Sequence, residues 1–257
     1  MKVVILAGGL GTRISEETEI RPKPMVEIGG KPILWHIMKW YSNFGLTEFI
    51  ICCGYKGHMI KEYFSKYRTL YCDSTYNLAN GKVKHHTPAC ENWSVTCVDT
   101  GLDTMTGGRI ARIKEYITPG ESFLLTYGDG VGNIDLNGLQ MFHQEHGRVL
   151  TVTGVRPPGR FGELVHSDGV ITEFNEKPQA TGGRISGGFF VATPKIFNYL
   201  DDDEELVFEQ KPMRKLVDDK QLMVFEHNGF WQPMDTSREY QLLNSLYDTG
   251  DAPWVNW

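Results

Sequence analysis

A glycine-rich segment directly after a short apolar run constrains the fold of this chain more than any other feature. The run Lys2 to Leu6 predicts a short buried strand, which continues into Leu6-Ala7-Gly8-Gly9-Leu10-Gly11-Thr12-Arg13. In a parallel sheet, ligands bind beyond the carboxyl ends of the strands. Glycines at that edge let the backbone approach phosphate groups and expose N–H donors, and Arg13 adds a charged fork for phosphate oxygens. The alternative interpretation is a tight turn without function.

The segments that follow alternate between helical and strand patterns. Apolar residues recur at helical spacing from Lys31 to Phe44, with Pro32 in the first turn and Gly45 as a stop. A buried strand is expected at Glu48 to Cys53 and a helix at Gly57 to Tyr67. This order predicts an α/β fold, with a parallel sheet and helices on both of its faces. Further strands are expected at Ser94 to Val98, Ser122 to Tyr127 and Val149 to Val155, further helices at Gly108 to Ile117 and Leu136 to His146, and an irregular loop or hairpin from Arg68 to Trp93.

The pattern changes after Pro157-Pro158, where shorter elements predominate. The expected strands are Glu163 to His166, Val170 to Asn175, Ile185 to Ala192 and Leu222 to His227, and the expected helices follow Pro194, begin at the acidic run Asp201 to Glu205, and span Ser237 to Tyr247. No repeat or low-complexity linker divides the chain, so we expect a single domain over residues 1–257. Within it, residues 1–155 form a nucleotide-binding part and residues 156–257 a mixed α/β part.

Composition excludes several classes of protein. The 257 residues carry 26 basic and 32 acidic side chains, a net charge of −6, which argues against a nucleic-acid-binding protein but leaves room for a small anionic ligand. The longest early apolar run, Val3 to Ala7, is too short for a signal peptide or a membrane span, so we expect a cytoplasmic protein. Five cysteines, an odd number without a C-x-x-C pair, are interpreted as free thiols.

Two familiar phosphate-binding motifs do not fit. A dinucleotide fingerprint needs a third glycine, which Gly9-Leu10-Gly11-Thr12-Arg13-Ile14 lacks, and a Walker loop needs Ser or Thr where Pro32 follows Gly30-Lys31. The missing glycine counts against an NAD-dependent oxidoreductase, although the glycine loop and the α/β pattern favour that class. A non-catalytic nucleotide-sugar sensor stays open as the second alternative.

Three charged residues are candidates for phosphate chemistry. Lys23 lies between Pro22 and Pro24, which stiffen the segment, limit where the ammonium can point and are expected to keep the lysine out of a helix. Asp129 follows a predicted strand and is flanked by glycines, and Asp235 is its best partner for Mg²⁺, which binds one or two carboxylates together with substrate phosphates. The alternatives are an exposed lysine, a turn aspartate and a cap, or near-cap, of the last helix at Asp235.

A series of short motifs occurs in a fixed order along the chain. It comprises Gly8-Gly9-Leu10-Gly11-Thr12-Arg13, Pro22-Lys23-Pro24, Gly30-Lys31-Pro32, Gly128-Asp129, Glu176-Lys177-Pro178 and Asp235. The series resembles the signature of the sugar-1-phosphate nucleotidyltransferase family. The resemblance implies a Rossmann-like, three-layer αβα fold with a mostly parallel mixed sheet and a smaller sugar-binding portion.

Three more segments resemble one branch of that family. They are Ile14-Ser15-Glu16-Glu17-Thr18, Thr104-Met105-Thr106-Gly107-Gly108-Arg109 and Pro233-Met234-Asp235-Thr236. The branch transfers a cytidylyl group from CTP to glucose 1-phosphate and supplies CDP-glucose for dideoxysugars of bacterial surface polysaccharide (O-antigen). Another nucleotide, dTTP or UTP, with another sugar is the alternative. Many relatives have an apolar-Pro-apolar-Thr stretch where this chain has Ser15 to Ile20, so roles in that loop are not carried over.

The resemblance implies a role for each matching residue. The catalytic residues are Arg13 and Lys23, the metal ligands for Mg²⁺ are Asp129 and Asp235, the nucleotide-binding residues are Leu6 to Arg13, Thr104, Arg109 and Gly128, and the sugar-phosphate-binding residues are Gly162, Glu176, Lys177 and Gly188. The implied partners are CTP, glucose 1-phosphate and further copies of the chain in a homo-oligomer, with a hexamer expected for this branch; no nucleic acid or membrane is involved.

Overall fold

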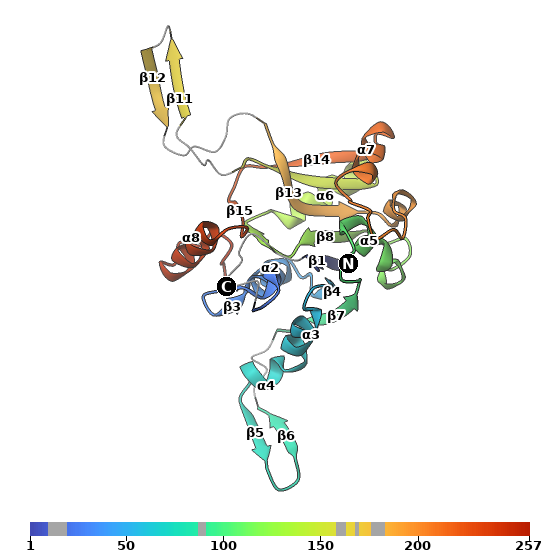
Figure 1. Ribbon diagram of the computed structural model, residues 1–257, viewed down its shortest axis with the longest axis vertical. Coiled ribbons are helices and arrows are strands. Elements are labelled where there is room, and N and C mark those ends of the chain that lie inside the picture. Colours follow the sequence, from blue (N-terminus) through green and yellow to red (C-terminus); the bar gives the residue numbers. More distant parts are fainter. Residues whose placement is uncertain (10–19, 87–90, 158–162, 168–169, 176–182) are drawn as a thin grey trace.

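A seven-stranded sheet forms the centre of the molecule (Figure 1). The computed structural model describes residues 1–9, 20–86, 91–157, 163–167, 170–175 and 183–257. From one edge to the other, the strands are β14 (Leu222–His227), β10 (Leu150–Val155), β13 (Ile185–Ala192), β8 (Phe123–Tyr127), β1 (Lys2–Ala7), β4 (Glu48–Cys53) and β7 (Ser94–Asp99). Neighbouring strands are parallel except at β13, which is antiparallel to both β8 and β10. The α/β fold with a mostly parallel mixed sheet is thus confirmed.

Helices and short strands surround this sheet. The helices are α2 (Ile33–Ser42), α3 (Gly57–Ser65), α4 (Tyr67–Tyr71), α5 (Thr106–Arg112), α6 (Leu136–His146), α7 (Lys211–Asp218) and α8 (Ser237–Asp248), with 3₁₀ turns η1 (Lys23–Met25), η2 (Lys114–Tyr116) and η3 (Pro194–Tyr199). The short strands pair as β2 (Glu27–Ile28) with β3 (Lys31–Pro32), β5 (Ser74–Asn77) with β6 (Lys82–His85), β9 (Gly130–Gly132) with β15 (Trp231–Pro233), and β11 (Glu163–Ser167) with β12 (Val170–Asn175). No helix of the described ranges has the length and apolar character needed to cross a bilayer.

Two hydrophobic cores lie on the two faces of the sheet. Successive side chains of a strand point to opposite faces, so Val3 and Ile5 of β1 join the core under α2 and α8, and Val4 and Leu6 join the core under α5 and α7. A strand that is buried on both faces is apolar throughout, which is why the first strand was recognisable as a continuous run. Each such side chain contributes about 1.5–3 kcal/mol to folding.

Several element boundaries differ from expectation for local reasons. The first helix begins at Ile33 because Lys31-Pro32 pairs with β2. The segment from 68 to 93 contains α4 and the β5–β6 hairpin, whose turn contains Gly81 at φ +71°. The helix expected over 108–117 is α5 followed by the 3₁₀ turn η2.

The acidic run from Asp201 to Glu205 does not begin a helix; the next α-helix, α7, starts only at Lys211. The run lies against α5 instead, where Arg112 pairs with Asp202 and Glu204. Backbone carbonyls in the run and just after it also accept N–H groups at the start of α5: Met105 N donates to Glu204 O, and Gly107 N donates to Leu206 O. The expectation was wrong because these partners lie about a hundred residues away in sequence.

The cysteine interpretation also needs a correction. Cys52, Cys53 and Cys97 are free thiols, but Cys72 is disulfide-bonded. An odd count excludes the pairing of all five cysteines and does not exclude one pair. Cys90 lies outside the described residues.

Candidate active site

Three charged side chains from distant segments meet at the carboxyl end of β8. The Lys23 ammonium lies 2.6 Å from Asp129 Oδ2 and also pairs with Asp235 Oδ1. Burial by itself lowers the pKa of Lys23, but the charges and hydrogen bonds of Asp129 and Asp235 outweigh burial and raise the pKa above its usual value. Lys23 is therefore a firmly protonated cation between two carboxylates.

Local structure presents Lys23 from a single 3₁₀ turn, not from an extended segment. Met25 N donates to Pro22 O at 2.8 Å, and Val26 N donates to Lys23 O at 3.1 Å. The expectation that the prolines keep Lys23 out of any helix was wrong, because Pro24 stands at an early position of the turn, where no N–H is required. The prolines still limit the backbone on either side of the lysine.

Pairing of two short strands brings Asp235 to Asp129. Asp129 lies between β8 and β9, and β9 pairs antiparallel with β15, which ends two residues before Asp235. Met234 N donates to Asp129 O at 2.8 Å, which fixes the two chain segments side by side.

The cap of the last helix is Thr236, not Asp235. Thr236 and Glu239 form a capping box at the start of α8, and Glu239 Oε2 accepts the backbone N–H groups of Asp235 and Thr236 at 2.8 and 2.9 Å. The carboxylate of Asp235 is therefore left to pair with Lys23.

These two carboxylates suit a hard divalent cation. Asp129 and Asp235 converge on one ammonium, which shows that their oxygens favour positive charge at that point. Mg²⁺ needs only one or two protein carboxylates when phosphate oxygens and water complete its shell. Within the described part of the chain, no group of three or more His, Cys, Asp or Glu side chains could hold a metal ion by itself.

The described part of the glycine loop, Leu6 to Gly9, adjoins the same edge. Leu6 O accepts the N–H of Gly128 at 2.9 Å, and a Cβ on Gly128 would lie 2.9 Å from this oxygen, so glycine allows the close approach. Gly8 O accepts the N–H of Tyr55 at 3.2 Å. The loop is thus joined to the ends of β8 and β4. Leu10, Gly11, Thr12 and Arg13 lie outside the described residues.

Arg109 lies beneath this loop with only 4% of its surface exposed. Its guanidinium donates to the carbonyl oxygens of Gly8, Cys53, Gly101 and Leu102 and to the hydroxyl of Thr100, over 2.7 to 3.3 Å. Burial lowers the pKa of Arg109, which nevertheless stays charged at neutral pH. Thr104 is also buried, and its hydroxyl accepts from Arg112 Nη1 at 2.8 Å. Arg109 and Thr104, the two predicted nucleotide contacts, therefore lie at the expected edge of the sheet. In this structure their polar atoms form hydrogen bonds with other groups of the protein.

Of the predicted sugar-phosphate residues, the described chain includes Gly188. It has a φ of +75°, and a Cβ there would lie 2.3 Å from the ring of Tyr127. Gly162, Glu176 and Lys177 lie outside the described residues.

Sequence reasoning missed a polar network behind Gly188. The Tyr127 hydroxyl donates to Glu209 Oε1, and the Thr106 hydroxyl donates to Glu209 Oε2 at 2.7 Å. Burial and the Glu209 charge raise the pKa of Tyr127, so it stays a neutral donor. The available signal was the position of Tyr127 two residues before Asp129; Glu209 had no comparable signal.

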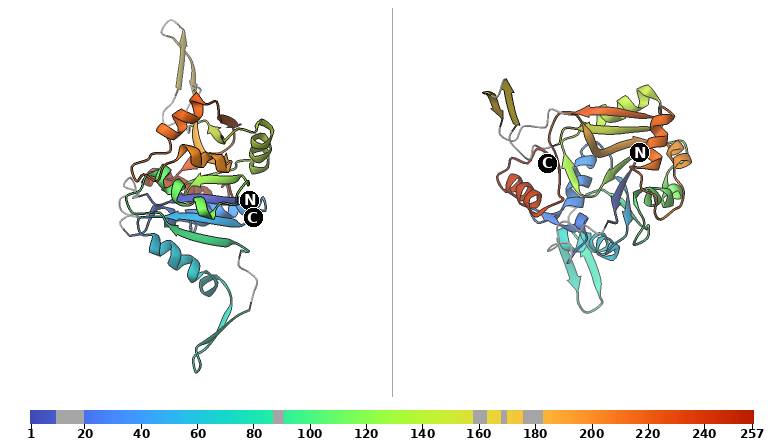
Figure 2. Two further views of the ribbon diagram at one scale, coloured as in Figure 1. Left: turned by 90° about the vertical axis from the view of Figure 1, so that its right-hand side faces the viewer. Right: turned by 45° about the horizontal axis from the view of Figure 1, so that its top comes forward.

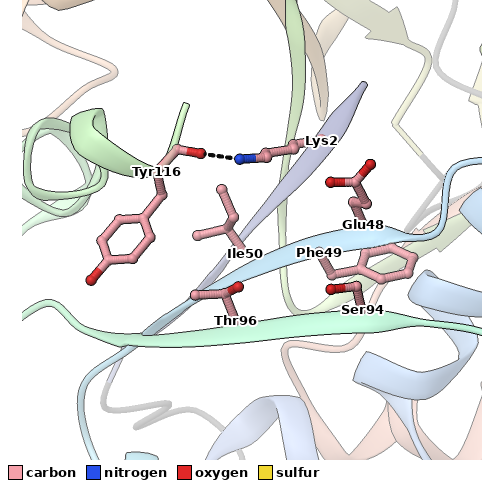
Figure 3. A pocket seen from close by; sticks show the side chains of 7 residues that line it. All are labelled: Lys2, Glu48, Phe49, Ile50, Ser94, Thr96 and Tyr116. Atoms are coloured by element: carbon pink, nitrogen blue, oxygen red, sulfur yellow. Dashed lines mark hydrogen bonds between the residues drawn. The ribbon is translucent and has the colours of Figure 1, made fainter. Parts of the chain in front are cut away.

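Two hollows lie at opposite ends of the strands of the sheet. One of about 260 Å³ lies at the carboxyl edge beside Gly54, lined by Cys53, Lys56, Gly57, His58, Lys61 and Asp99. The other lies where β1, β4 and β7 begin, and there Lys2 Nζ donates to Tyr116 O at 2.6 Å (Figure 3). The second hollow is therefore separated from the glycine loop by the length of the strands.

The chain is similar to other proteins along nearly its whole length. Residues 2–245 match the family model described as nucleotidyl transferase. The chain is 52% identical to the glucose-1-phosphate cytidylyltransferase of Salmonella typhi and 46% identical to a probable glucose-1-phosphate cytidylyltransferase of Bacillus subtilis, each over all of both chains. Among solved structures, HddC from Yersinia pseudotuberculosis has a TM-score of 0.67 at 23% identity, covering 96% of this chain and 99% of its own, which supports the fold.

Proposed function

The chain belongs to the nucleotidyl transferase family, and we propose that it transfers a cytidylyl group from CTP to α-D-glucose 1-phosphate. The products are CDP-glucose and pyrophosphate, and the pathway served is dideoxysugar and O-antigen synthesis. CTP is a cytoplasmic nucleotide, so the reaction belongs in the cytoplasm. The choice of nucleotide and sugar is supported by the 52% identity, over the whole chain, to an enzyme with that name.

One observation in the structure carries the proposal. Lys23, Asp129 and Asp235 meet at the carboxyl edge of the sheet, where the glycine loop also begins after β1. A reaction between two polyanions is limited by the repulsion between their phosphates and by their relative orientation. Charged groups of both signs beside backbone N–H donors can reduce that repulsion and hold the phosphates in place.

The reaction needs no general base. The second pKa of a sugar phosphate is near ~6, so glucose 1-phosphate is mostly a dianion at neutral pH. One of its oxygens forms a bond to the α-phosphorus of CTP while the bond from the α-phosphorus to the bridging oxygen breaks in line. The electron pair leaves with pyrophosphate. Lys23 neutralises charge on the transferred phosphate and on the leaving pyrophosphate, and Arg13 is assigned the same role on the loop.

Asp129 and Asp235 would hold Mg²⁺, since their oxygens already converge on one cation. When bound, the ion would neutralise phosphate charge and orient the triphosphate. Both carboxylates are about one-third exposed, which leaves them accessible from solvent.

The remaining assignments follow the family pattern. Residues 1–155 bind the nucleotide through Leu6 to Arg13, Thr104, Arg109 and Gly128. Residues 156–257 bind the sugar phosphate through Gly162, Glu176, Lys177 and Gly188.

A pyrophosphate-release assay tests the proposal. CTP, UTP and dTTP are each combined with several sugar 1-phosphates in the presence of Mg²⁺, and CTP with glucose 1-phosphate should give the fastest release. Faster release from another pair would reassign the substrates. Binding of CDP-glucose without any release would indicate a sensor, and a change in nicotinamide fluorescence on mixing would indicate an oxidoreductase.

The β5–β6 hairpin supports a homo-oligomer, with a hexamer as the expected size. Figures 1 and 2 show the hairpin projecting from the body beyond α3 and α4. Tyr76, Leu78 and Val83 on it are exposed, and a lone two-stranded hairpin is marginally stable in water. A second copy of the chain would cover these apolar side chains. Light scattering measures the size, and Leu78→Asp with Val83→Lys should reduce it; an unchanged size would assign the contact elsewhere.

A further inference from the structure

The carboxylate of Glu209 joins two segments that are far from it in sequence. The hydroxyl of Tyr127, the last residue of β8, donates to Oε1. The hydroxyl of Thr106, the first residue of α5, donates to Oε2 at 2.7 Å. One side chain from the segment before α7 therefore bridges the end of the strand that leads to Asp129 and the start of α5.

The backbone beside Glu209 is anchored in the core. The Thr106 hydroxyl accepts the N–H of Phe208 at 2.9 Å while it donates to the Glu209 carboxylate. Phe208 is fully buried, and its ring makes an edge contact with the ring of Phe190. These contacts limit where the carboxylate of Glu209 can lie, although the residue itself is exposed.

The ring of Tyr127 lies directly against Gly188. A Cβ at residue 188 would lie 2.3 Å from this ring, and the φ of Gly188 is +75°, so both the available space and the backbone require glycine. The two residues lie on β8 and β13, which are neighbours in the sheet (Figure 1). The ring also makes an edge contact with Phe190, with the centroids 5.9 Å apart. The position of the Tyr127 ring and that of the Gly188 backbone therefore depend on each other.

We propose that Glu209 is a positioning residue for the sugar-phosphate subsite, because it fixes the Tyr127 hydroxyl and, through the Tyr127 ring, the backbone of Gly188. The inference rests on the proposed function, which assigns Gly188 to the sugar phosphate. The carboxylate and the ring are in place before any substrate binds, and such preorganisation reduces the cost of ordering the subsite.

Loss of the Glu209 carboxylate should affect the two bridged segments unequally. The start of α5 keeps a backbone hydrogen bond to the same loop, from Gly107 N to Leu206 O at 2.8 Å. The Tyr127 hydroxyl, in contrast, donates to Glu209 and to no other group within the described ranges. Burial and the Glu209 charge raise the pKa of Tyr127, so its hydroxyl stays a neutral donor that needs an acceptor. We therefore expect the effect on the sugar phosphate to exceed the effect on the nucleotide.

Steady-state kinetics separate this effect from a general loss of structure. Glu209→Ala, and Tyr127→Phe, which keeps the ring and removes the hydroxyl, should each raise KM for glucose 1-phosphate about 10-fold, because a hydrogen bond to a charged group is lost. KM for CTP and kcat should stay close to their wild-type values. Glu205→Ala is the matched control, since Glu205 is an exposed acid on the same loop, and it should leave all three constants unchanged.

Two kinetic outcomes would overturn the inference. One is an equal rise of both KM values in Glu209→Ala, which would indicate a general structural role for the carboxylate. The other is a wild-type KM for glucose 1-phosphate in that variant, which would show that the subsite does not depend on Glu209.

A double-mutant cycle tests the contact without relying on turnover. If the two side chains act as one unit, Glu209→Ala combined with Tyr127→Phe should be no less stable in urea unfolding than the worse single variant. KM for glucose 1-phosphate in the double variant should likewise be no higher than in the worse single variant. Additive effects on stability and on KM would contradict the inference. A wild-type chain that forms no CDP-glucose would instead refute the proposed function, and the stability cycle would still report on the contact.

Discussion

The carboxyl edge of the sheet holds two largely buried cations, Lys23 and Arg109, in different surroundings. Lys23 pairs with the carboxylates of Asp129 and Asp235. Arg109 donates to backbone carbonyls and one hydroxyl. The partners of Lys23 are also the proposed ligands of a divalent cation, so its charge is available to phosphates once that cation is bound. The partners of Arg109 are four backbone carbonyls and the Thr100 hydroxyl, all supplied by the fold itself.

This difference separates a group that can change partners from a group that holds the architecture. An ammonium on a flexible stem can move between carboxylate and phosphate oxygens, whereas a guanidinium with several fixed acceptors loses all of them together if it moves. We therefore expect substitutions near Lys23 to affect turnover and substitutions near Arg109 to affect binding.

Asp129→Asn should abolish most turnover while the fold survives. The change removes one negative charge from the proposed metal site, and we expect a loss on the order of 10³-fold, or about 4 kcal/mol of transition-state stabilisation. Pyrophosphate release at saturating Mg²⁺ measures it. Asp135→Asn is the matched control, because that carboxylate caps α6 by accepting from Gly138 N. Wild-type turnover in Asp129→Asn would refute the metal role.

Lys23→Ala should slow turnover more than it weakens CTP binding. The ammonium is expected to act on charge that develops at the transferred phosphate, so we expect turnover to fall about 10²-fold and affinity to fall by a much smaller factor. Single-turnover kinetics and calorimetry with CTP measure the two effects separately. If affinity alone changed, Lys23 would be a binding group, and the contrast with Arg109 would disappear.

His36 is a buried group that, unlike Lys23 and Arg109, is uncharged in the folded protein at neutral pH. Its Nε2 lies 2.8 Å from Ile28 O, and burial, with a smaller contribution from the Lys31 charge, lowers its pKa to about 4 despite that hydrogen bond. Between pH 6.5 and 4 the unfolded chain therefore binds a proton that the folded chain does not, so stability falls as pH falls. Burial of His143 acts in the same direction and lowers its pKa to about 4.

Urea unfolding at pH 7, 6 and 5 measures this dependence. One histidine accounts for at most about 1.4 kcal/mol per pH unit, and His36→Gln should remove that share of the slope. The exposed His58→Gln should keep the wild-type slope. An unchanged slope in His36→Gln would show that its ring is already charged in the folded protein.

Thr236→Ala should have the smallest effect. It removes one half of the capping box of α8 and should cost about 1 kcal/mol of stability. Asp235 immediately precedes the cap, so we expect some loss of turnover. The loss should be smaller than in Asp129→Asn, because both carboxylates are retained. Thermal unfolding and pyrophosphate release measure the two effects, and a turnover loss as large as that of Asp129→Asn would mean that the cap fixes the carboxylate.

Local patterns predicted much of the fold. The strand at 48–53 and the helix at 136–146 match to the residue, and β1 and α8 match to within one residue. These elements were predictable because apolar periodicity and glycine stops act over a few neighbouring residues. The acidic run from 201 to 205 was not predictable, because Arg112 and the backbone of α5 determine its conformation.

The candidate site was predictable in its residue types and not in its contacts. The placement of Asp129 after a strand indicated the carboxyl edge, and Asp235 was its expected partner. Nothing in the sequence around Arg109 indicated that it lies under Gly8, because β1, β4 and the turn after β7 surround it.

By itself, the sequence determined the alternation of strands and helices and the position of a glycine loop after the first strand, because such signals depend on neighbours along the chain. The tertiary structure alone decided that Asp129 and Asp235 share one lysine and that Arg109 is surrounded by carbonyls. Those contacts depend on the pairing of β9 with β15 and on the packing of α5 beneath the loop, which join residues that are far apart along the chain.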